Sequence, residues 1–323
     1  MTQAPTPTAD TVRRLVRSLM KNGGGSTGGA GGDGPDVRPV TEEGGPWTWW
    51  VGTRHVLRLA PDRHAVVRQR RELRLRDLVR PHVGVAVPVS VAHGEWSGGL
   101  TYTLDTRVPG TAAPVHDVSA VGEDDLAGLL AGLREVPQRQ AEALGVPRLP
   151  ARSLEALWTA AGRAAKQLAG ADEFDPARLG QLTAPNAAQL TAPAAVLVHH
   201  ALTGEHLLVG ADGRVRGVLD WSDAAVGDPA EDIARLATAV GAPAAVRAAT
   251  LAGYGARPCL RGLWLARCDT VVALAAAAAA ATRGRGAAAT PPGPPGPPVL
   301  RERLRRAWEP ILLERVTDLR GED

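Results

Sequence analysis

Residues 196–237 hold the side chains whose types and spacing best suit chemistry. An apolar VLV segment leads into a polar loop with three histidines, an LLV segment follows, ADGR makes a turn, and VRGVLD ends at Asp220. Short aliphatic and β-branched runs separated by turn residues favour strands. Imidazole groups exchange protons near neutral pH, and carboxylates bind hard cations. The stretch therefore predicts a polar loop beside a hairpin, with Asp220 at the hairpin exit.

The order of these residues resembles the catalytic motif of aminoglycoside and macrolide phosphotransferases, a family with a protein-kinase-like fold. The family motif reads HGD, four further residues, Asn, two strands, an IDW-type triplet and a DP step. In this chain the same places hold His199-His200-Ala201, His206, Leu219-Asp220-Trp221 and Asp228-Pro229. In kinase-type phosphoryl transfer, the loop Asp orients and deprotonates the attacking hydroxyl, and the two later positions bind Mg²⁺. The resemblance therefore implies that His206 and Asp220 are metal ligands.

Two positions depart from the common form of the motif. His206 stands where many relatives have Asn, and in this it resembles the macrolide phosphotransferases, although imidazole is a poor ligand for Mg²⁺. Ala201 stands where the catalytic-base Asp is expected, and a methyl group neither accepts a proton nor aligns a hydroxyl. Loss of a positioned base typically lowers the rate by about 10²–10⁴. His199 or His200 is a candidate substitute base, and the alternative is that His199 is structural.

A second pair, Arg58 and Glu72, resembles the family's phosphate-binding pair. HVLRLAP is similar to the strand that carries the nucleotide-anchoring cation, here Arg58, and the helix RQRRELRLRDL supplies Glu72. Arginine stays charged and can hold a phosphate with two donors. The resemblance implies that the pair positions the α and β phosphates, with Gly44-Gly45 as a candidate phosphate-covering turn. Without the motif, the two residues would be interpreted as a surface ion pair on a solvated helix.

Three aspartates after the motif favour structural roles. Asp228 precedes Pro229 and is expected to cap the N-terminus of a helix, with proline at its first position. Asp232 falls in the acidic first turn that suits the helix dipole. Asp223 is likewise expected to have a structural rather than a chemical role. We expect Trp221 to pack in the interior rather than to stack on a substrate.

Short β-rich segments and one helix surround Arg58 and Glu72. From residue 40 to 109 the sequence runs WTWWV, HVLRLA, a helical stretch near 64–80, VAVPVSVAH and LTYTLDTRV, which predicts a small lobe over 38–109. Residues 1–37 combine a helix near 8–21 with a glycine tract. We interpret the tract as a flexible linker because it lacks the GK[ST] ending of a phosphate-binding loop.

Beyond residue 109 the pattern becomes mainly helical. Helices are expected near 122–145, 152–170, 229–241, 243–254, 260–282 and 300–318, around a β-rich patch at 196–220. The proline-rich stretch 284–298 is expected to be an extended loop. Residues 110–323 therefore form a helical lobe that contains the catalytic-loop-like segment 196–232. The resemblance covers about 38–282 and implies an α+β, bilobal protein-kinase-like fold, with a small β-rich N-lobe and a larger mainly helical C-lobe.

Composition argues against several classes of partner. The formal charge is +3, and 37 Lys and Arg residues are spread along the chain rather than gathered in one block, which does not suggest a nucleic-acid binder. Two cysteines indicate no metal cluster and no oxidising compartment. The N-terminus lacks the apolar core of a signal peptide, and the apolar run 271–281 is too short to span a bilayer. We therefore expect a cytoplasmic protein with no membrane partner.

The resemblance leaves two main hypotheses for function. In the first, the protein transfers the γ-phosphate of ATP or GTP, with Mg²⁺, to a hydroxyl of an antibiotic-like small molecule such as a macrolide or an aminoglycoside. In the second, it is a pseudokinase-like protein that binds nucleotide or ligand without turnover, because Ala201 replaces the base. A regulatory or structural partner in a biosynthetic cluster is a third hypothesis, which the sequence does not separate from the second.

Overall fold

The computed structural model describes residues 6–22, 36–40, 45–113, 117–283 and 296–311. The chain divides into two compact units, each described here by itself. Of the described residues, those up to Asp77 and Val87–Val108 belong to the first unit, and Leu78–Ala86 and those from Pro109 on belong to the second. The glycine tract, Gly44 and most of the proline-rich stretch lie outside the described residues.

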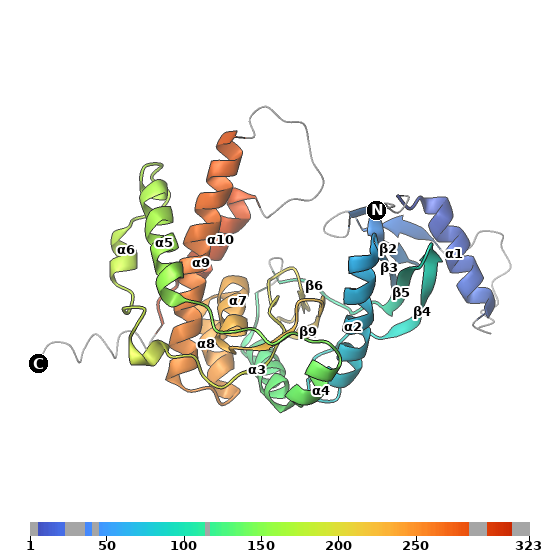
Figure 1. Cartoon of the computed structure of the whole chain (residues 1–323), viewed down its shortest axis with the longest axis horizontal. Coiled ribbons are helices and arrows are strands. Elements are labelled where there is room, and N and C mark those ends of the chain that lie inside the picture. Colours follow the sequence, from blue (N-terminus) through green and yellow to red (C-terminus); the bar gives the residue numbers. More distant parts are fainter. Residues whose placement is uncertain (1–5, 23–35, 41–44, 114–116, 284–295, 312–323) are drawn as a thin grey trace, which may run out of the picture. The chain divides into compact units, whose positions relative to one another are not determined.

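An antiparallel sheet forms the centre of the first unit (Figure 1). Its five strands have the order β1-β2-β3-β5-β4, and their bounds are Val37–Pro39, Thr48–Val51, His55–Leu59, Leu100–Thr106 and Ser90–Ser97. A short 3-10 turn, η1 (Gly45–Trp47), precedes β2, and helix α2 (Arg63–Val79) follows β3. Strands β2, β3 and β5 and helix α2 lie in the segments expected for the small lobe, β4 overlaps the end of the expected segment VAVPVSVAH, and β1 was not expected.

Helix α1 (Ala9–Asn22) completes the core of this unit. Its apolar stripe includes Val12 and Val16, which are fully buried against Trp49, Leu57 and Leu104 of the sheet. Residues spaced by four in a helix share one face, so the sequence pattern places both valines towards the strands. The burial of this stripe explains why a helix forms there.

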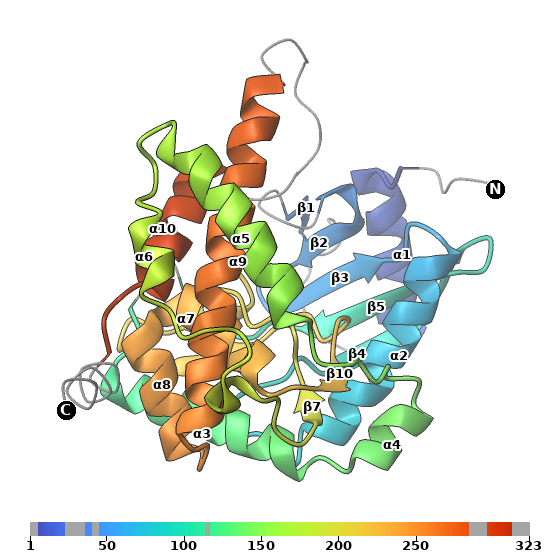
Figure 2. The same cartoon turned by 60° about the vertical axis from the view of Figure 1, so that its left-hand side comes forward.

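The second unit contains two small sheets among helices (Figures 1 and 2). One sheet pairs β7 (Val196–Val198) with β10 (Ala225–Gly227), and the other has the order β6 (Thr111–Ala112), β8 (Leu207–Val209), β9 (Val215–Val218). The helices are α3 (Ala120–Glu135), α4 (Gln138–Ala143), α5 (Leu154–Ala169), α6 (Ala177–Gly180), α7 (Ala230–Val240), α8 (Ala242–Leu251), α9 (Ala256–Arg283) and α10 (Pro297–Ala307), with a 3-10 turn η2 (Ala188–Leu190). The hairpin expected after the polar loop is β8-β9.

Helix α9 is the central element of the second unit, and it packs against α5, α7, α8 and α10 (Figure 2). Among the described residues it alone has the length and apolar composition of a helix that could cross a membrane, and 56% of its apolar window is buried inside the protein. Core helices of globular proteins share this composition. Its packing partners therefore account for its apolar character.

Some element bounds differ from the sequence expectation. The single helix expected over 122–145 is two helices, α3 and α4, because Pro137 between them has no backbone N–H to continue the ladder. Strands β1, β6 and β10 were not expected, since two or three residues carry too little periodicity to be recognised. The helix expected over 300–318 is described only as α10, and residues 312–318 lie outside the described part of the chain.

Candidate functional site

Arg58 and Glu72 form a two-pronged ion pair in the first unit. Arg58 lies on β3 and Glu72 on α2, and Nη1 and Nη2 of Arg58 donate to Oε1 and Oε2 of Glu72 at 2.7 and 2.8 Å. The Glu72 side chain is 2% exposed, whereas that of Arg58 is 31% exposed. Two parallel hydrogen bonds fix the plane of a guanidinium as well as its position. The structure thus brings together the two residues that were paired from the sequence.

A second arginine and a second carboxylate extend this pair. Nη1 and Nη2 of Arg76 donate to Asp105 at 3.1 and 3.2 Å, the Thr103 hydroxyl donates to Asp105 at 3.2 Å, and Nη1 of Arg58 lies 3.9 Å from Asp105. Buried charges need such compensation. Sequence reasoning missed both residues. The available signal for Arg76 was its spacing of four from Glu72 on one helix, and Asp105 had no local signal because its partner is 29 residues away.

In the second unit, Asp232 on α7 holds the start of the polar loop. Its Oδ2 accepts the backbone N–H of His199 and its Oδ1 accepts that of His200, both at 2.7 Å. Burial raises the pKa of Asp232 to about 7, although the two backbone donors act in the opposite direction. His200 has a positive φ of 66°, a conformation that L-residues rarely adopt. The carboxylate therefore fixes the chain at the exit of β7.

His199 is held as a neutral imidazole. Its Nε2–H donates to the carbonyl oxygen of Leu219 at 3.1 Å, its Nδ1 accepts the backbone N–H of Ala201 at 3.3 Å, and its ring lies edge-on to Trp221 at 4.5 Å. Burial lowers its pKa to about 3, and the nearby His206 acts in the same direction. Both ring nitrogens are engaged inside the protein, which favours the structural interpretation of His199 over that of a substitute base.

His206 and Asp220 face each other at the end of the loop and hairpin. The carbonyl oxygen of Ala201 accepts a hydrogen bond from Nδ1 of His206 at 2.7 Å, so Nδ1 carries the proton. Nε2 then points towards Oδ2 of Asp220, 3.7 Å away. A lone pair of a neutral imidazole and a carboxylate oxygen face each other favourably only with a proton or a cation between them. This arrangement fits two ligands of one cation.

The backbone supports the same geometry around Asp220. The N–H of Leu219 donates to the carbonyl oxygen of His206 at 2.9 Å, which ties the loop to the end of β9. Asp220 has a positive φ of 55°, and its Oδ1 accepts the N–H of Ser222 at 3.3 Å. Among the described residues no group of three or more His, Cys, Asp and Glu side chains could hold a metal. Mg²⁺ commonly takes only one or two protein ligands beside water and substrate phosphates, so two residues suit it.

Ala201 contributes its backbone and no polar side chain to the loop. Its carbonyl oxygen accepts from His206 and from the N–H of Thr203, at 2.7 Å in each case, and its methyl group is mostly buried. His200 next to it is half-buried, and no hydrogen bond to its ring occurs in the described part of the chain. Burial lowers the pKa of His200, with Glu231 and Arg235 nearby. Of the two histidines beside Ala201, only His200 has a ring that is not engaged.

The comparison with protein families decides the assignment. Residues 36–263 match the phosphotransferase enzyme family, a range that includes the Arg58–Glu72 pair and the whole polar loop with Asp220. The chain belongs to this family. Helix α10 lies beyond the matched range.

One curated relative is a viomycin phosphotransferase from Streptomyces vinaceus. It is 28% identical over 194 residues, which are 56% of this chain and 65% of the relative. The match thus spans slightly less than two thirds of that phosphotransferase.

Solved structures of phosphotransferases share the fold. The GDP complex of aminoglycoside 2'-phosphotransferase-IIIa is 18% identical, with a TM-score of 0.61 over 95% of this chain and 99% of that chain. A macrolide 2'-phosphotransferase from Brachybacterium faecium is 23% identical, with a TM-score of 0.52 over 82% of this chain and 87% of that chain. These similarities confirm the expected α+β, bilobal protein-kinase-like fold.

The DP step, Asp228-Pro229, is fixed by a buried ion pair. Oδ2 of Asp228 accepts from Nε of Arg261 at 2.5 Å, and Nη1 of Arg261 donates to the carbonyl oxygen of Leu190 at 2.6 Å. Oδ1 of Asp228 accepts the N–H of Ala230 at 2.9 Å. Helix α7 begins at Ala230 with Pro229 as its N-cap residue, one position later than expected. Asp228 has a structural role, as the sequence suggested.

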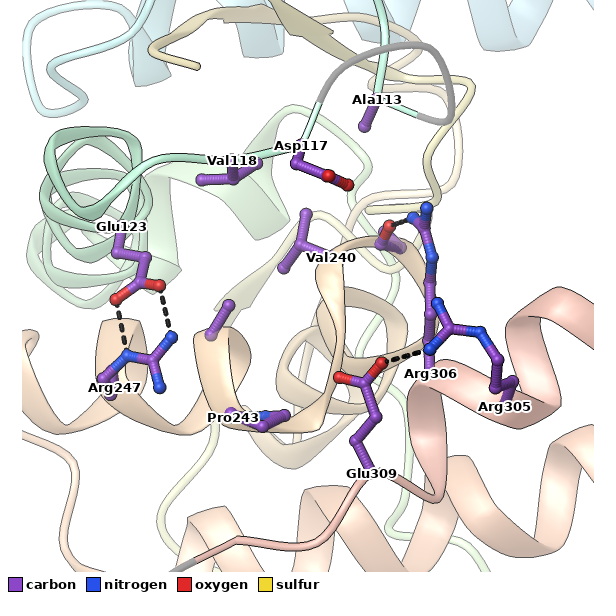
Figure 3. Close-up of a pocket in the computed structure, with 12 residues that line it drawn as sticks. Ala113, Asp117, Val118, Glu123, Val240, Pro243, Arg247, Arg305, Arg306 and Glu309 are labelled. Atoms are coloured by element: carbon purple, nitrogen blue, oxygen red, sulfur yellow. Dashed lines mark hydrogen bonds and ion pairs between the residues drawn. The ribbon is translucent and has the colours of Figure 1, made fainter.

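A cavity of about 390 Å³ lies between α3, α7, α8 and α10 in the second unit (Figure 3). Its charged groups neutralise one another: Arg247 donates two hydrogen bonds to Glu123, and Arg305 donates one to Glu309. None of the residues singled out from the sequence lines it. The lining residues are Ala113, Asp117, Val118, Glu123, Ala239, Val240, Pro243, Ala244, Arg247, Arg305, Arg306 and Glu309.

Proposed function

We propose that this protein binds ATP or GTP with Mg²⁺ and transfers the γ-phosphate to a hydroxyl of a small, antibiotic-like molecule. The observation that carries the proposal is the His206–Asp220 pair, in which Nε2 and Oδ2 face each other at 3.7 Å while Nδ1 is fixed to the backbone. Relatives named for GDP, aminoglycosides, macrolides and viomycin support the substrate classes. A macrolide or an aminoglycoside is therefore the acceptor class to test first.

In the proposed function, one group of charged residues binds the phosphates of the nucleotide and another binds the cation. Arg58, held in one orientation by Glu72, offers a fixed cation to the phosphates of the nucleotide. His206 and Asp220 hold the cation, which supplies charge neutralisation for the transferring phosphoryl group. Both contributions are electrostatic, and phosphoryl transfer depends mainly on positioning and charge.

Ala201 limits the turnover that we expect. A methyl group leaves the attacking hydroxyl without a base at the position of the family motif, and His199 is unavailable because both of its ring nitrogens are engaged. His200 is the remaining histidine beside this position, with a half-buried ring. The lost base specifically favours a second candidate function, in which the protein binds nucleotide or ligand without turnover.

A cytoplasmic location belongs to the same proposal. Cys259 and Cys268 are buried free thiols, which suits a reducing compartment. Fractionation of cells that express the full chain would test this, and recovery of the protein with a membrane or exported fraction would contradict it.

The decisive experiment measures binding and transfer separately. Mg²⁺-dependent binding of ATP and GTP is measured by calorimetry, and phosphate transfer is measured on a macrolide and aminoglycoside panel. Wild type is compared with Ala201→Asp and, as a control that lacks the carboxylate of the cation site, with the double variant Ala201→Asp, Asp220→Ala. We expect Mg²⁺-dependent nucleotide binding in wild type and a gain of about 10²–10⁴ in transfer rate in Ala201→Asp, because a positioned base is worth that much.

Each outcome separates the two functions. Fast transfer by wild type would exclude the binding-only alternative and would call for a His200→Gln variant to find the base. Binding without transfer in wild type, with transfer in Ala201→Asp, would show an intact site that lacks only its base. Absence of nucleotide binding at millimolar concentration would overturn the proposed function altogether.

A further inference from the structure

The polar loop is held by one ion pair that comes from outside the region matched to the family. Glu205 immediately precedes His206, and its carboxylate pairs with the guanidinium of Arg303 on α10. The two side chains are each 21% exposed, so the pair is largely withdrawn from water. Burial acts to raise the pKa of Glu205. The charge of Arg303 and hydrogen bonds, one of them from Thr203, have the larger effect and lower the pKa below its ordinary value, so the carboxylate is ionised.

Helix α10 is anchored firmly enough to serve as a support. Its apolar side chains Leu300, Leu304 and Ala307 are buried, and it packs against α7 and α9. Nε of Arg267 on α9 donates to the carbonyl oxygen of Ala307 at 3.1 Å. Arg301 lies two residues before Arg303 on the same helix, and its side chain pairs with Glu173 rather than with the loop. The helix thus has contacts independent of Glu205 that fix its position.

Between Ala201 and His206 the loop contains one fully buried apolar side chain, Leu202, and its side chains make few polar contacts with other elements. Asp232 holds the two residues before Ala201, and a backbone bond from Ala113 to the carbonyl oxygen of Gly204 holds the far side. Ala201 has no polar side chain that could add to these. Among the described side chains of residues 201–206, Glu205 is the one that forms an ion pair with a helix outside the loop.

We propose that Arg303 is a positioning residue that, through Glu205, keeps Nε2 of His206 facing Asp220. Because Glu205 and His206 are adjacent, a displacement of the Glu205 backbone moves the His206 imidazole relative to Asp220. The importance of this contact for cation binding rests on the proposed function, whereas its effect on loop order does not. Residues that orient metal ligands commonly change metal affinity by about tenfold or more when they are lost.

The test compares Arg303→Met with Arg301→Met in the full chain. The two residues lie on the same helix and each loses one ion pair, but only Arg303 reaches the loop. One readout is hydrogen exchange of the peptide that covers 199–207. The other is the Mg²⁺ concentration at half-maximal ATP binding. We expect Arg303→Met to speed exchange in that peptide and to raise the Mg²⁺ midpoint about tenfold, and Arg301→Met to change neither.

Two further variants keep the test independent of folding. Glu205→Gln should reproduce both effects from the loop side, and Glu205→Arg with Arg303→Glu should restore slow exchange by reversing the pair. Equal exchange in Arg303→Met and Arg301→Met would overturn the positioning role. If wild type binds no nucleotide, the proposed function fails, and the exchange comparison alone decides whether Arg303 orders the loop.

Discussion

Nε2 of His206 lies 3.7 Å from Oδ2 of Asp220, because the other ring nitrogen of His206 is bound to the carbonyl oxygen of Ala201 in its own loop. The loop backbone therefore selects the tautomer and aims the free nitrogen at the carboxylate. A side chain that replaces the imidazole must therefore place a donor atom near Oδ2 of Asp220.

We predict that His206→Asn retains Mg²⁺-dependent nucleotide binding, whereas His206→Leu and Asp220→Ala, which lack a donor atom, lose most of it. An amide oxygen suits a hard cation at least as well as an imidazole nitrogen does, and Leu has no donor atom. The Mg²⁺ midpoint for ATP binding, measured by calorimetry, should rise about tenfold or more in His206→Leu and stay within about threefold of wild type in His206→Asn. A wild-type midpoint in His206→Leu would remove His206 from the cation site.

The buried pair Arg76–Asp105 should matter more for stability than any exposed pair in the first unit. Their side chains are 2% and 4% exposed, so Asp105→Asn leaves a buried guanidinium without its main partner. Loss of one partner of a buried pair costs about 3–5 kcal/mol. The matched control is Arg13→Met, which removes an exposed pair with Asp10 and should cost less than about 1 kcal/mol. Urea unfolding followed by tryptophan fluorescence would measure both, and equal costs would contradict the prediction.

The sequence predicted those site residues whose positions lie in a motif with fixed spacing. Arg58 and Glu72, and His206 and Asp220, were each recognised from neighbouring residues, and the structure brings each pair together. Asp105 and Glu205 were missed, because their partners are 29 and 98 residues away and only the folded chain places them in contact. Long-range ion pairs of this kind depend on helix packing, which periodicity within one segment does not report.

Asp232→Asn should loosen the polar loop without changing the size of the side chain. The carboxylate accepts two backbone N–H groups at 2.7 Å, whereas an amide offers one oxygen and turns its NH₂ donors towards the second N–H. A buried N–H left without an acceptor costs about 1–3 kcal/mol. Hydrogen exchange of the amides of His199 and His200 should therefore accelerate. Asp223→Asn, at an exposed position in the same segment, is the control and should leave exchange unchanged.

His199 should make the protein lose stability as the pH falls from about 6.5 towards 3. Its pKa in the folded protein is lowered to about 3 from an ordinary value of 6.5, chiefly because burial disfavours the charged ring. Below pH 6.5 the imidazole binds a proton in the unfolded chain but not in the folded chain. His199 therefore lowers the free energy of unfolding by up to about 1.4 kcal/mol for each pH unit. Above pH 6.5 the contribution is complete and constant.

The His199→Gln variant isolates this contribution. Gln cannot titrate, so the difference in unfolding free energy between wild type and variant should shrink as the pH is lowered from 7.5 to 5. Asp232 titrates with the opposite sign, since its pKa is raised to about 7, but it is present in both proteins and largely cancels in the difference. His64→Gln, at an exposed position on α2, controls for the substitution itself. A difference between wild type and His199→Gln that stays constant over this range would show that His199 is not held neutral in the folded protein.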